Sequence, residues 1–378
     1  MKNVYLFNPE NDLALASGSI HYTAPKKPRK MATDLVRLPQ WYAEKGNEAE
    51  FITAEQLGNC QYSAEDRLIP WGWNQSLLPK ARKAGFTDRT LPGEEQIKLL
   101  RELSHRRTGV RLLEELTQSE PRLLCGKSTE CYSLSEVEKF RIPNPHIILK
   151  APWSCSGRGL LKITGNEIPL QSRQWIGHIL STQGSIIAEA LQERVCDFAL
   201  EFYVDKGKKI TFKGYSLFET DTKGIYKRNI LDTDEHIEQY LTRWIPASIL
   251  YDVRCQLKTE LESTLAITRY TGFLGIDMLV ARFDSAPFYR LLPCVEINLR
   301  MNMGVLAHRL TQCLIEKGKR GIFCIDNFPT PELLFQDHEK NQKSFPLLTS
   351  DSLIRKGYYS LTPLTPSSLY RAAVWIDS

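Results

Sequence analysis

The sequence predicts a protein of mixed α/β and α+β architecture with two or three domains, and three observations lead to this prediction. The chain has 378 residues, more than one hydrophobic core usually organises. Its first 95 residues alternate short apolar runs with amphipathic segments, which is typical of a small parallel α/β domain. Beyond them, apolar strand patterns and two long helical patterns indicate an α+β region.

We expect an N-terminal domain over residues 1–95, a central domain over 96–327 and a C-terminal tail over 328–378 that packs back on the body. The strands expected in the N-terminal domain are Val4–Phe7, Glu50–Thr53 and Arg67–Trp71. A helix is expected at Asp34–Lys45, where apolar residues recur at helical spacing. The order of these elements predicts a parallel sheet.

The central domain is expected to begin with one long helix over 97–118 and to contain two further helices, Arg254–Thr271 and Val305–Glu316. The strands Ile186–Ala190, Phe198–Val204 and Lys209–Phe218 are predicted to share one antiparallel sheet. Two more strands, Gly275–Arg282 and Phe288–Ile297, are predicted to pair across a short turn. The tail is expected to end in a strand pair near 358–361 and 370–376.

Composition and charge exclude several classes of function. The net charge of +5 arises from 49 basic and 44 acidic residues that are mostly interleaved, which argues against nucleic-acid binding. The basic run Lys26–Lys30 is either a solvated loop or an anion-binding loop. No apolar segment is long enough for a signal peptide or membrane span. Nine cysteines without CxxC spacing favour a reducing, cytoplasmic location over disulfides or a zinc site.

A candidate phosphate-binding segment begins with the apolar strand that ends at Lys150 and continues in the loop Ser154–Gly159. Small residues let backbone N–H groups approach a phosphate closely, and a lysine leaving the strand can reach the phosphates as a point charge. A simple Gly/Ser turn with a solvated lysine explains this segment about as well. The spacing matches neither GxxxxGK[ST] nor GxGxxG.

A candidate metal site lies on the two paired strands near the end of the central domain. Asp277 lies within one apolar strand, and Glu296 and Asn298 alternate with apolar residues on the other. Antiparallel pairing would bring two carboxylates and an amide oxygen together, a ligand set that suits Mg²⁺ bound to substrate phosphates. The alternative is a half-exposed sheet whose polar face is acidic. Because carboxylates on buried strands are costly unless paired or metal-bound, we favour the metal site.

From Leu149 to Gly304 the chain resembles the ATP-grasp superfamily, and the order and spacing of the motifs are more specific than any one of them. The resemblance implies an ATP-grasp fold of two α+β subdomains that enclose the nucleotide, preceded by a Rossmann-like domain. It implies that the nucleotide phosphates contact Lys150, Ser154, Ser156, Gly157 and Gly159. The hinge for adenine matches Ile186–Leu191 and so includes Glu189, Ala190 and Leu191.

The resemblance also implies roles for acidic and basic residues farther along. The ribose acid is Asp197 or, less well placed, Glu193, and two magnesium ions (or Mn²⁺) are held by Asp277, Glu296 and Asn298. Arg300 matches an arginine that faces phosphate or substrate. The charge over the γ-phosphate comes from Lys213, or from Lys227 and Arg228.

Two features depart from the family pattern. Relatives carry a second nucleotide lysine upstream, where this chain has Ser104–Thr108; the expected substitute is Arg106 or Arg107, whose guanidinium presents a fork rather than a point charge. The ribose acid is an aspartate where glutamate is usual.

The resemblance implies a magnesium- and ATP-dependent ligase that joins an unidentified carboxylate to an amine, a thiol or a similar acceptor through an acyl phosphate. A phosphotransferase and a non-catalytic nucleotide-binding module are the alternatives, and a homodimer is one possible assembly. Substrate contacts are expected at Asn8–Asp12, which follow the first strand, although helix capping explains these residues equally well.

Overall fold

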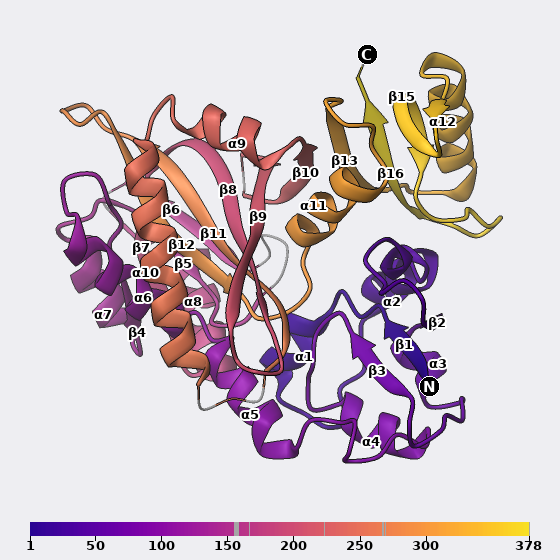
Figure 1. The fold of residues 1–378 in the computed structure, drawn as a ribbon. Helices are drawn as coiled ribbons and strands as arrows, with labels where there is room; N and C mark the ends of the chain where they lie inside the picture. The colour runs from indigo at the N-terminus through magenta and orange to yellow at the C-terminus, as the bar shows by residue number, and fades with distance from the viewer. Residues whose placement is uncertain (155–158, 166, 223, 267, 269, 378) are drawn as a thin grey trace.

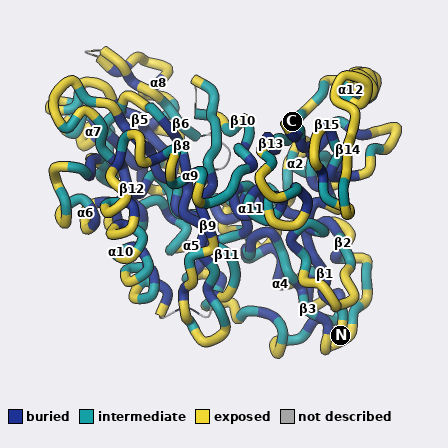
Figure 2. The backbone as a smooth tube through the Cα atoms, turned by 45° about the horizontal axis from the view of Figure 1, so that its top comes forward, coloured by how far each residue is buried: buried dark blue, intermediate teal, exposed yellow. Residues whose placement is uncertain are grey.

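We describe the fold from a computed structural model, which covers residues 1–154, 159–165, 167–222, 224–266, 268 and 270–377. The chain forms three sheets (Figure 1). Buried residues follow the strands, whereas exposed residues follow the loops and the outer sides of the helices (Figure 2). Within the described ranges, no helix has both the length and the apolar character needed to cross a bilayer.

The N-terminal sheet is parallel and has the order β2-β1-β3, so the predicted parallel α/β domain is confirmed. Its strands are β1 (Lys2–Leu6), β2 (Glu48–Ile52) and β3 (Arg67–Pro70). The helices around it are α1 (Asn11–Ser17), α2 (Lys26–Asp34), the 3-10 helix η1 (Leu38–Trp41), α3 (Ala54–Leu57) and α4 (Leu77–Lys83). The basic run Lys26–Lys30 therefore starts a helix and is not a loop.

The second sheet is antiparallel, has four strands in the order β4-β7-β5-β6, and carries the predicted phosphate-binding lysine at the end of β5. Its strands are β4 (Ser128–Cys131), β5 (His146–Lys150), β6 (Leu160–Thr164) and β7 (Ile186–Ala190). Helices α7 (Leu134–Arg141) and α8 (Leu170–Gln183) pack with this sheet around a small separate core.

The third sheet has nine strands in the order β12-β11-β8-β9-β10-β13-β16-β15-β14. They are β8 (Glu193–Val204), β9 (Ile210–Thr220), β10 (Tyr226–Leu231), β11 (Gly272–Arg282), β12 (Tyr289–Asn298), β13 (Gly321–Asn327), β14 (Leu348–Ser350), β15 (Leu353–Ser360) and β16 (Tyr370–Ile376). The predicted pairing of the two acidic strands is confirmed as β11 with β12. The connecting helices are α9 (Asp234–Leu241), α11 (Met303–Cys313) and α12 (Pro331–Ser344).

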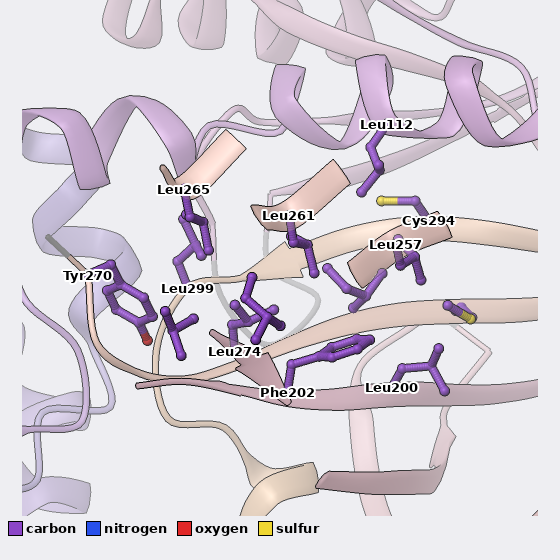
Figure 3. Close-up of a cluster of buried hydrophobic side chains, with 14 of the residues drawn as sticks. Leu112, Leu200, Phe202, Leu257, Leu261, Leu265, Tyr270, Leu274, Cys294 and Leu299 are labelled. Atoms are coloured by element: carbon purple, nitrogen blue, oxygen red, sulfur yellow. The ribbon is translucent and has the colours of Figure 1, made fainter. Parts of the chain in front are cut away.

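One face of β8 and β11 packs against α6 (Arg107–Ser119) and α10 (Ala247–Leu265). Figure 3 shows Leu257, Leu261 and Leu265 of α10 over Leu200 and Phe202 of β8. Because side chains alternate along a strand, this packing leaves the odd-numbered residues of β8 and their neighbours on β11 on the opposite face. That opposite face carries the candidate site.

Three sequence-based predictions about the central domain are wrong. Strand β7 lies in the four-stranded sheet and not beside β8 and β9. The helix predicted over 97–118 is two helices, α5 (Glu94–Leu103) and α6, because the chain leaves helical pairing at Ser104 and restarts after Arg106. The helix predicted over Arg254–Thr271 starts and ends earlier, as α10, because the extended Pro246 fixes its beginning.

The C-terminal strands continue the large sheet, since β16 pairs with β13 along its whole length and with β15. The fully buried Arg371 on β16 donates hydrogen bonds to Asp326 and Asp337, which ties the strand to β13 and α12. A second hydrophobic core joins β1, α11 and β16. The N-terminal domain and the C-terminal strands are therefore packed around common side chains.

Candidate nucleotide and metal site

The three predicted metal ligands lie together on the open face of β11 and β12. Asp277 stands directly opposite Glu296, and Gly275 stands opposite Asn298. The amide nitrogen of Asn298 lies 3.2 Å from a carboxylate oxygen of Asp277. Alternation along the two strands thus brings two carboxylates and one amide to one place.

The electrostatics of this place favour a bound cation. Burial, together with the neighbouring Glu296, raises the pKa of Asp277 to about 7. Within the part of the chain that is described, no group of three or more His, Cys, Asp and Glu side chains could hold a metal alone. A site with two carboxylates and one amide fits Mg²⁺, which commonly takes one or two carboxylates and completes its shell with water and substrate phosphate.

Lys150 connects the two sheets that border this site. Its ammonium group, which is almost fully buried, donates a 2.7 Å hydrogen bond to Glu189 on β7 and lies 3.4 Å from the carbonyl oxygen of Val295 on β12. The ion pair with Glu189 compensates the buried charge of this lysine and fixes its ammonium group between the two sheets. The position agrees with the phosphate role predicted for Lys150.

The loop after Lys150 closes on itself. Ala151 donates its N–H to the carbonyl of Gly159 at 2.8 Å. Gly159 has a φ of +76°, and a Cβ atom there would lie 2.8 Å from the Cβ of Ser154, so this turn requires glycine. Ser156 and Gly157, which we predicted to contact phosphate, lie outside the described residues.

Arg106 bridges this loop and the metal-ligand candidates. Its guanidinium donates to the Ala151 carbonyl at 2.6 Å, to Ser154 Oγ at 2.8 Å and to Glu296 at 2.7 Å. Arg107, the other candidate for the upstream cation, points away and pairs with Glu130 on β4 at 2.9 Å. Of the two arginines, the geometry therefore favours Arg106 at the nucleotide phosphates.

The predicted hinge strand is β7, but its backbone donors are already used. Ala190 donates its N–H to the Lys127 carbonyl, and Leu191 donates to the His146 carbonyl, both at 2.9 Å. An adenine contact through the N–H of Leu191 would require that bond to break. The carbonyl oxygens and side chains of the hinge therefore fit adenine better than its N–H groups do.

Asp197, the predicted ribose acid, lies on β8, on the face that carries the metal-ligand candidates. It accepts hydrogen bonds from Arg194 at 2.9 Å and from Thr220 at 3.0 Å. Burial raises its pKa, and Arg194 opposes that shift. Glu193, the alternative, is exposed at the start of β8 and lies near Arg282, so Asp197 is the better placed of the two.

Arg300 links the metal-bearing strand to the N-terminal domain. It follows β12 by two residues and forms a forked ion pair with Asp12 of α1, with N–O distances of 3.0, 3.2 and 2.7 Å. The next residue, Met301, donates its N–H to the Trp71 carbonyl at 2.9 Å. A narrow cleft of about 10 Å³ lies here, and its lining includes Asp12, Ser154, Glu296, Asn298 and Arg300.

Arg300 also lines a second, much larger cavity of about 750 Å³ between the N-terminal domain and the large sheet. Lys213, which we predicted to lie over the γ-phosphate, lines this cavity and is absent from the lining of the narrow cleft. Its ammonium group lies 5.6 Å from the ring centre of Tyr203. The alternative pair is less suitable, because Lys227 is exposed and Arg228 is bound to Glu219 at 2.9 Å.

Glu201 was not among the residues predicted for the site, although it lies on the same face as the metal-ligand candidates. Glu201 stands opposite Gly275 on β11, is 1% exposed, and accepts a 2.8 Å hydrogen bond from Asn302. A Cβ at Gly275 would lie 2.6 Å from its carboxylate, so the missing side chain makes room for it. The available signal was an acidic residue in phase with Asp197 on an otherwise apolar strand.

Glu201 predicts a pH dependence of stability. Burial raises its pKa to about 8, with the Asn302 hydrogen bond opposing the shift. Since the ordinary value is near 4.5, the folded protein binds this proton more tightly than the unfolded chain, and stability is lost as pH rises from about 4.5 to about 8. Glu201→Gln should remove the fall in unfolding free energy that ionisation of Glu201 causes, which amounts to roughly 1.4 kcal/mol per unit of pKa difference. Urea unfolding of both proteins at pH 5 and 8.5 measures it, and equal pH slopes would contradict it.

Comparisons with known proteins bear on the fold of the chain. No protein-family model and no curated protein matches the chain. Among solved structures, the Staphylococcus aureus N5-carboxyaminoimidazole synthetase complexed with ADP aligns over 100% of this chain and 93% of its own, with 13% identity and a TM-score of 0.50. An ADP complex of another N5-carboxyaminoimidazole ribonucleotide synthetase aligns over 100% and 92%, with 8% identity and a TM-score of 0.53.

A third match is biotin carboxylase from Campylobacter jejuni in an ATP-analogue complex, which aligns over 99% of this chain and 87% of its own. The identity is 12% and the TM-score 0.52. The three alignments span the N-terminal parallel sheet of this chain as well as the two sheets that follow it. This chain has the ATP-grasp fold. The predicted fold class, including the preceding small domain, is therefore confirmed.

The ATP-grasp fold accounts for the arrangement of the candidate residues. Lys150 comes from the four-stranded sheet, and Asp277, Glu296 and Asn298 come from the large sheet. Arg106 and Lys150 connect the two groups, since Arg106 donates to Glu296 and Lys150 lies 3.4 Å from the Val295 carbonyl oxygen. At such low identity the likeness establishes the fold, and the activity must be argued from the residues.

Proposed function

We propose that this ATP-grasp protein is an ATP- and magnesium-dependent ligase that joins a carboxylate to an amine or a similar nucleophile, releasing ADP and phosphate. The observation that carries the proposal is the complete acidic set on β11 and β12, with Asp277 facing Glu296 and Asn298 beside them. A nucleotide-binding module without catalysis has no use for two facing, partly buried carboxylates, whose placement costs free energy when no cation is bound. The structural neighbours are ligases and carboxylases with bound adenine nucleotides.

The candidate residues have distinct roles in this reaction. Lys150 and Arg106 would hold the phosphates, and Asp197 would bind the ribose. Asp277, Glu296 and Asn298 would hold Mg²⁺, which neutralises charge on the phosphates when bound. Arg300, at the junction of the narrow cleft and the large cavity, would orient the carboxylate for attack on the γ-phosphate.

The chemistry then needs positioning rather than a protein nucleophile. The substrate carboxylate takes the γ-phosphoryl group to give an acyl phosphate and ADP, and the amine displaces phosphate from that intermediate. Catalysis of this kind depends mainly on fixed positive charge around the transferring group. The cations of the site, Lys150, Arg106 and Arg300, are all held by carboxylate partners that fix their positions.

ADP release from Mg-ATP, measured with panels of carboxylates and amines, tests the proposal. A ligase should release ADP only with a carboxylate present. Added hydroxylamine should displace phosphate from the acyl phosphate, so that a hydroxamate forms in place of the usual product. ADP release that requires an alcohol and gives a phosphate ester would identify a phosphotransferase. Binding of Mg-ATP without turnover across the panels would support the non-catalytic alternative.

A further inference from the structure

The large cavity of about 750 Å³ continues the face that carries the metal-ligand candidates. Glu201 and Tyr203 on β8, and Phe273 on β11, lie in phase with Asp277 and line it. Its opposite wall is formed by the N-terminal domain, including Trp73. The volume falls within the range of sites that enclose an organic molecule of appreciable size. A ligand as small as bicarbonate or glycine would leave most of it filled with water.

Positive charge is concentrated at one end of this cavity. Lys213 on β9 and Arg309 on α11 both line it. Burial lowers the pKa of His308, and Arg309 and Lys213 lower it as well, against the raising effect of Asp234, whose carboxylate lies 3.7 Å from the ring and does not line the cavity. Within the described residues, neither Lys213 nor Arg309 has an acidic partner within 4 Å. His308 adds no charge at neutral pH, and the buried carboxyl of Glu201, with a pKa of about 8, does not cancel the two cations.

The remaining charges of the cavity are balanced. Arg300 is neutralised by Asp12. On the wall formed by the N-terminal domain, the charged lining consists of two acids and two arginines: Glu44, Asp88, Arg67 and Arg89. The excess positive charge therefore belongs to Lys213 and Arg309, at a place that the narrow cleft beside the metal-ligand candidates does not include.

The walls beside these cations are aromatic. Tyr203 and Phe273 pack edge to face with ring centres 4.9 Å apart, and Lys213 lies over the Tyr203 ring. Trp73 and Tyr270 complete an apolar lining. Ring faces of this kind accept a flat apolar group by stacking, while the adjacent cations attract an anion.

We propose that the cavity binds the carboxylate substrate, and that this substrate is an organic acid with an apolar or aromatic body and a second acidic group held by Lys213 and Arg309. The inference rests on the proposed function, because the carboxylate that reacts is the one that reaches Arg300. It assigns Lys213 to substrate recognition instead of the γ-phosphate. The second acidic group is a carboxylate, sulfonate or phosphate, which share the anionic oxygens that two cations recognise.

The fluorescent aromatic sulfonate 1-anilinonaphthalene-8-sulfonate tests the cavity without any nucleotide. The wild-type protein should bind it at one saturable site, and Lys213→Met with Arg309→Met should weaken binding at least tenfold. Arg89→Met is the matched control, because Arg89 lines the same cavity on the wall formed by the N-terminal domain and pairs with Glu65. This variant should change the affinity for the sulfonate less than twofold. The uncharged analogue N-phenyl-1-naphthylamine should bind wild type and double variant equally.

Competition tests the second acidic group. Phenylsuccinate should displace the sulfonate from wild type at least tenfold more effectively than phenylacetate, and the double variant should lose this preference. Equal competition by the two acids, or equal loss of sulfonate binding in Arg89→Met and the double variant, would overturn the inference. Sulfonate binding as predicted, together with no ADP release under any condition, would leave the cavity assignment standing and refute the ligase.

Discussion

Replacing Asp277 by asparagine should reduce magnesium-dependent ADP release at least about a hundredfold, on the scale of losing one transition-state electrostatic contact or more. The reason is that Asp277 supplies one of only two carboxylates in the proposed metal site. The same substitution should leave the protein folded and, above pH 7, at least as stable. With its pKa raised to about 7, the ionised side chain destabilises the metal-free fold, and asparagine removes that charge.

This combination separates a metal ligand from a structural residue. A structural residue would lose activity and stability together, whereas Asp277→Asn should lose activity alone. Glu193→Gln is a suitable control, because it removes an exposed carboxylate at the start of β8 and should change neither property. ADP release from Asp277→Asn within tenfold of wild type would show that Asp277 does not hold the metal.

The second large effect is expected at the ion pair between Asp12 and Arg300, whose members are 288 residues apart in sequence. Both side chains are mostly buried, with 14% and 16% exposure. Arg300→Ala should lower kcat by about a hundredfold with little change in the KM for ATP. Asp12→Ala should lower kcat by about tenfold or more, because the arginine fork then loses the carboxylate that aims it.

A double-mutant cycle tests whether Asp12 acts through Arg300. The double variant should be no slower than Arg300→Ala alone, since Asp12 has nothing left to orient. Glu55→Ala provides the control, because it breaks an exposed pair with Arg29 in the same domain and should be neutral. Additive losses in the double variant would show that Asp12 serves another purpose.

The parts of the site that were predictable from sequence are those governed by local periodicity. Alternation along two strands placed Asp277 with Glu296 and Asn298, and an apolar run ending in lysine located Lys150. Pairing between distant segments carries no such signal. The choice between Arg106 and Arg107 depends on the break between α5 and α6, which turns one toward Glu296 and the other toward Glu130.

The sheet to which a strand belongs could not be predicted from the local sequence pattern either. Strand β7 has the same composition as its neighbours in sequence, but its backbone pairs with β4 and β5, because the chain crosses between the two sheets after Ala190. The contact of Asp12 with Arg300 could not be predicted for the same reason. The sequence suggested Asn8–Asp12 as substrate or capping residues, and the structure adds that Asp12 pairs with Arg300, which lines both the narrow cleft and the large cavity.

Thermal unfolding with and without Mg-ATP tests the central claim most directly. Ligand binding to the folded state adds about 2.7 kcal/mol to the free energy of unfolding at a ligand concentration of 100 times Kd, and the unfolding midpoint rises as a result. We predict a clear rise with millimolar Mg-ATP, a smaller rise with ATP and a chelator, and loss of the magnesium-dependent part in Asp277→Asn. An unchanged midpoint for the wild-type protein at millimolar Mg-ATP would contradict the assignment of this cleft as a nucleotide site.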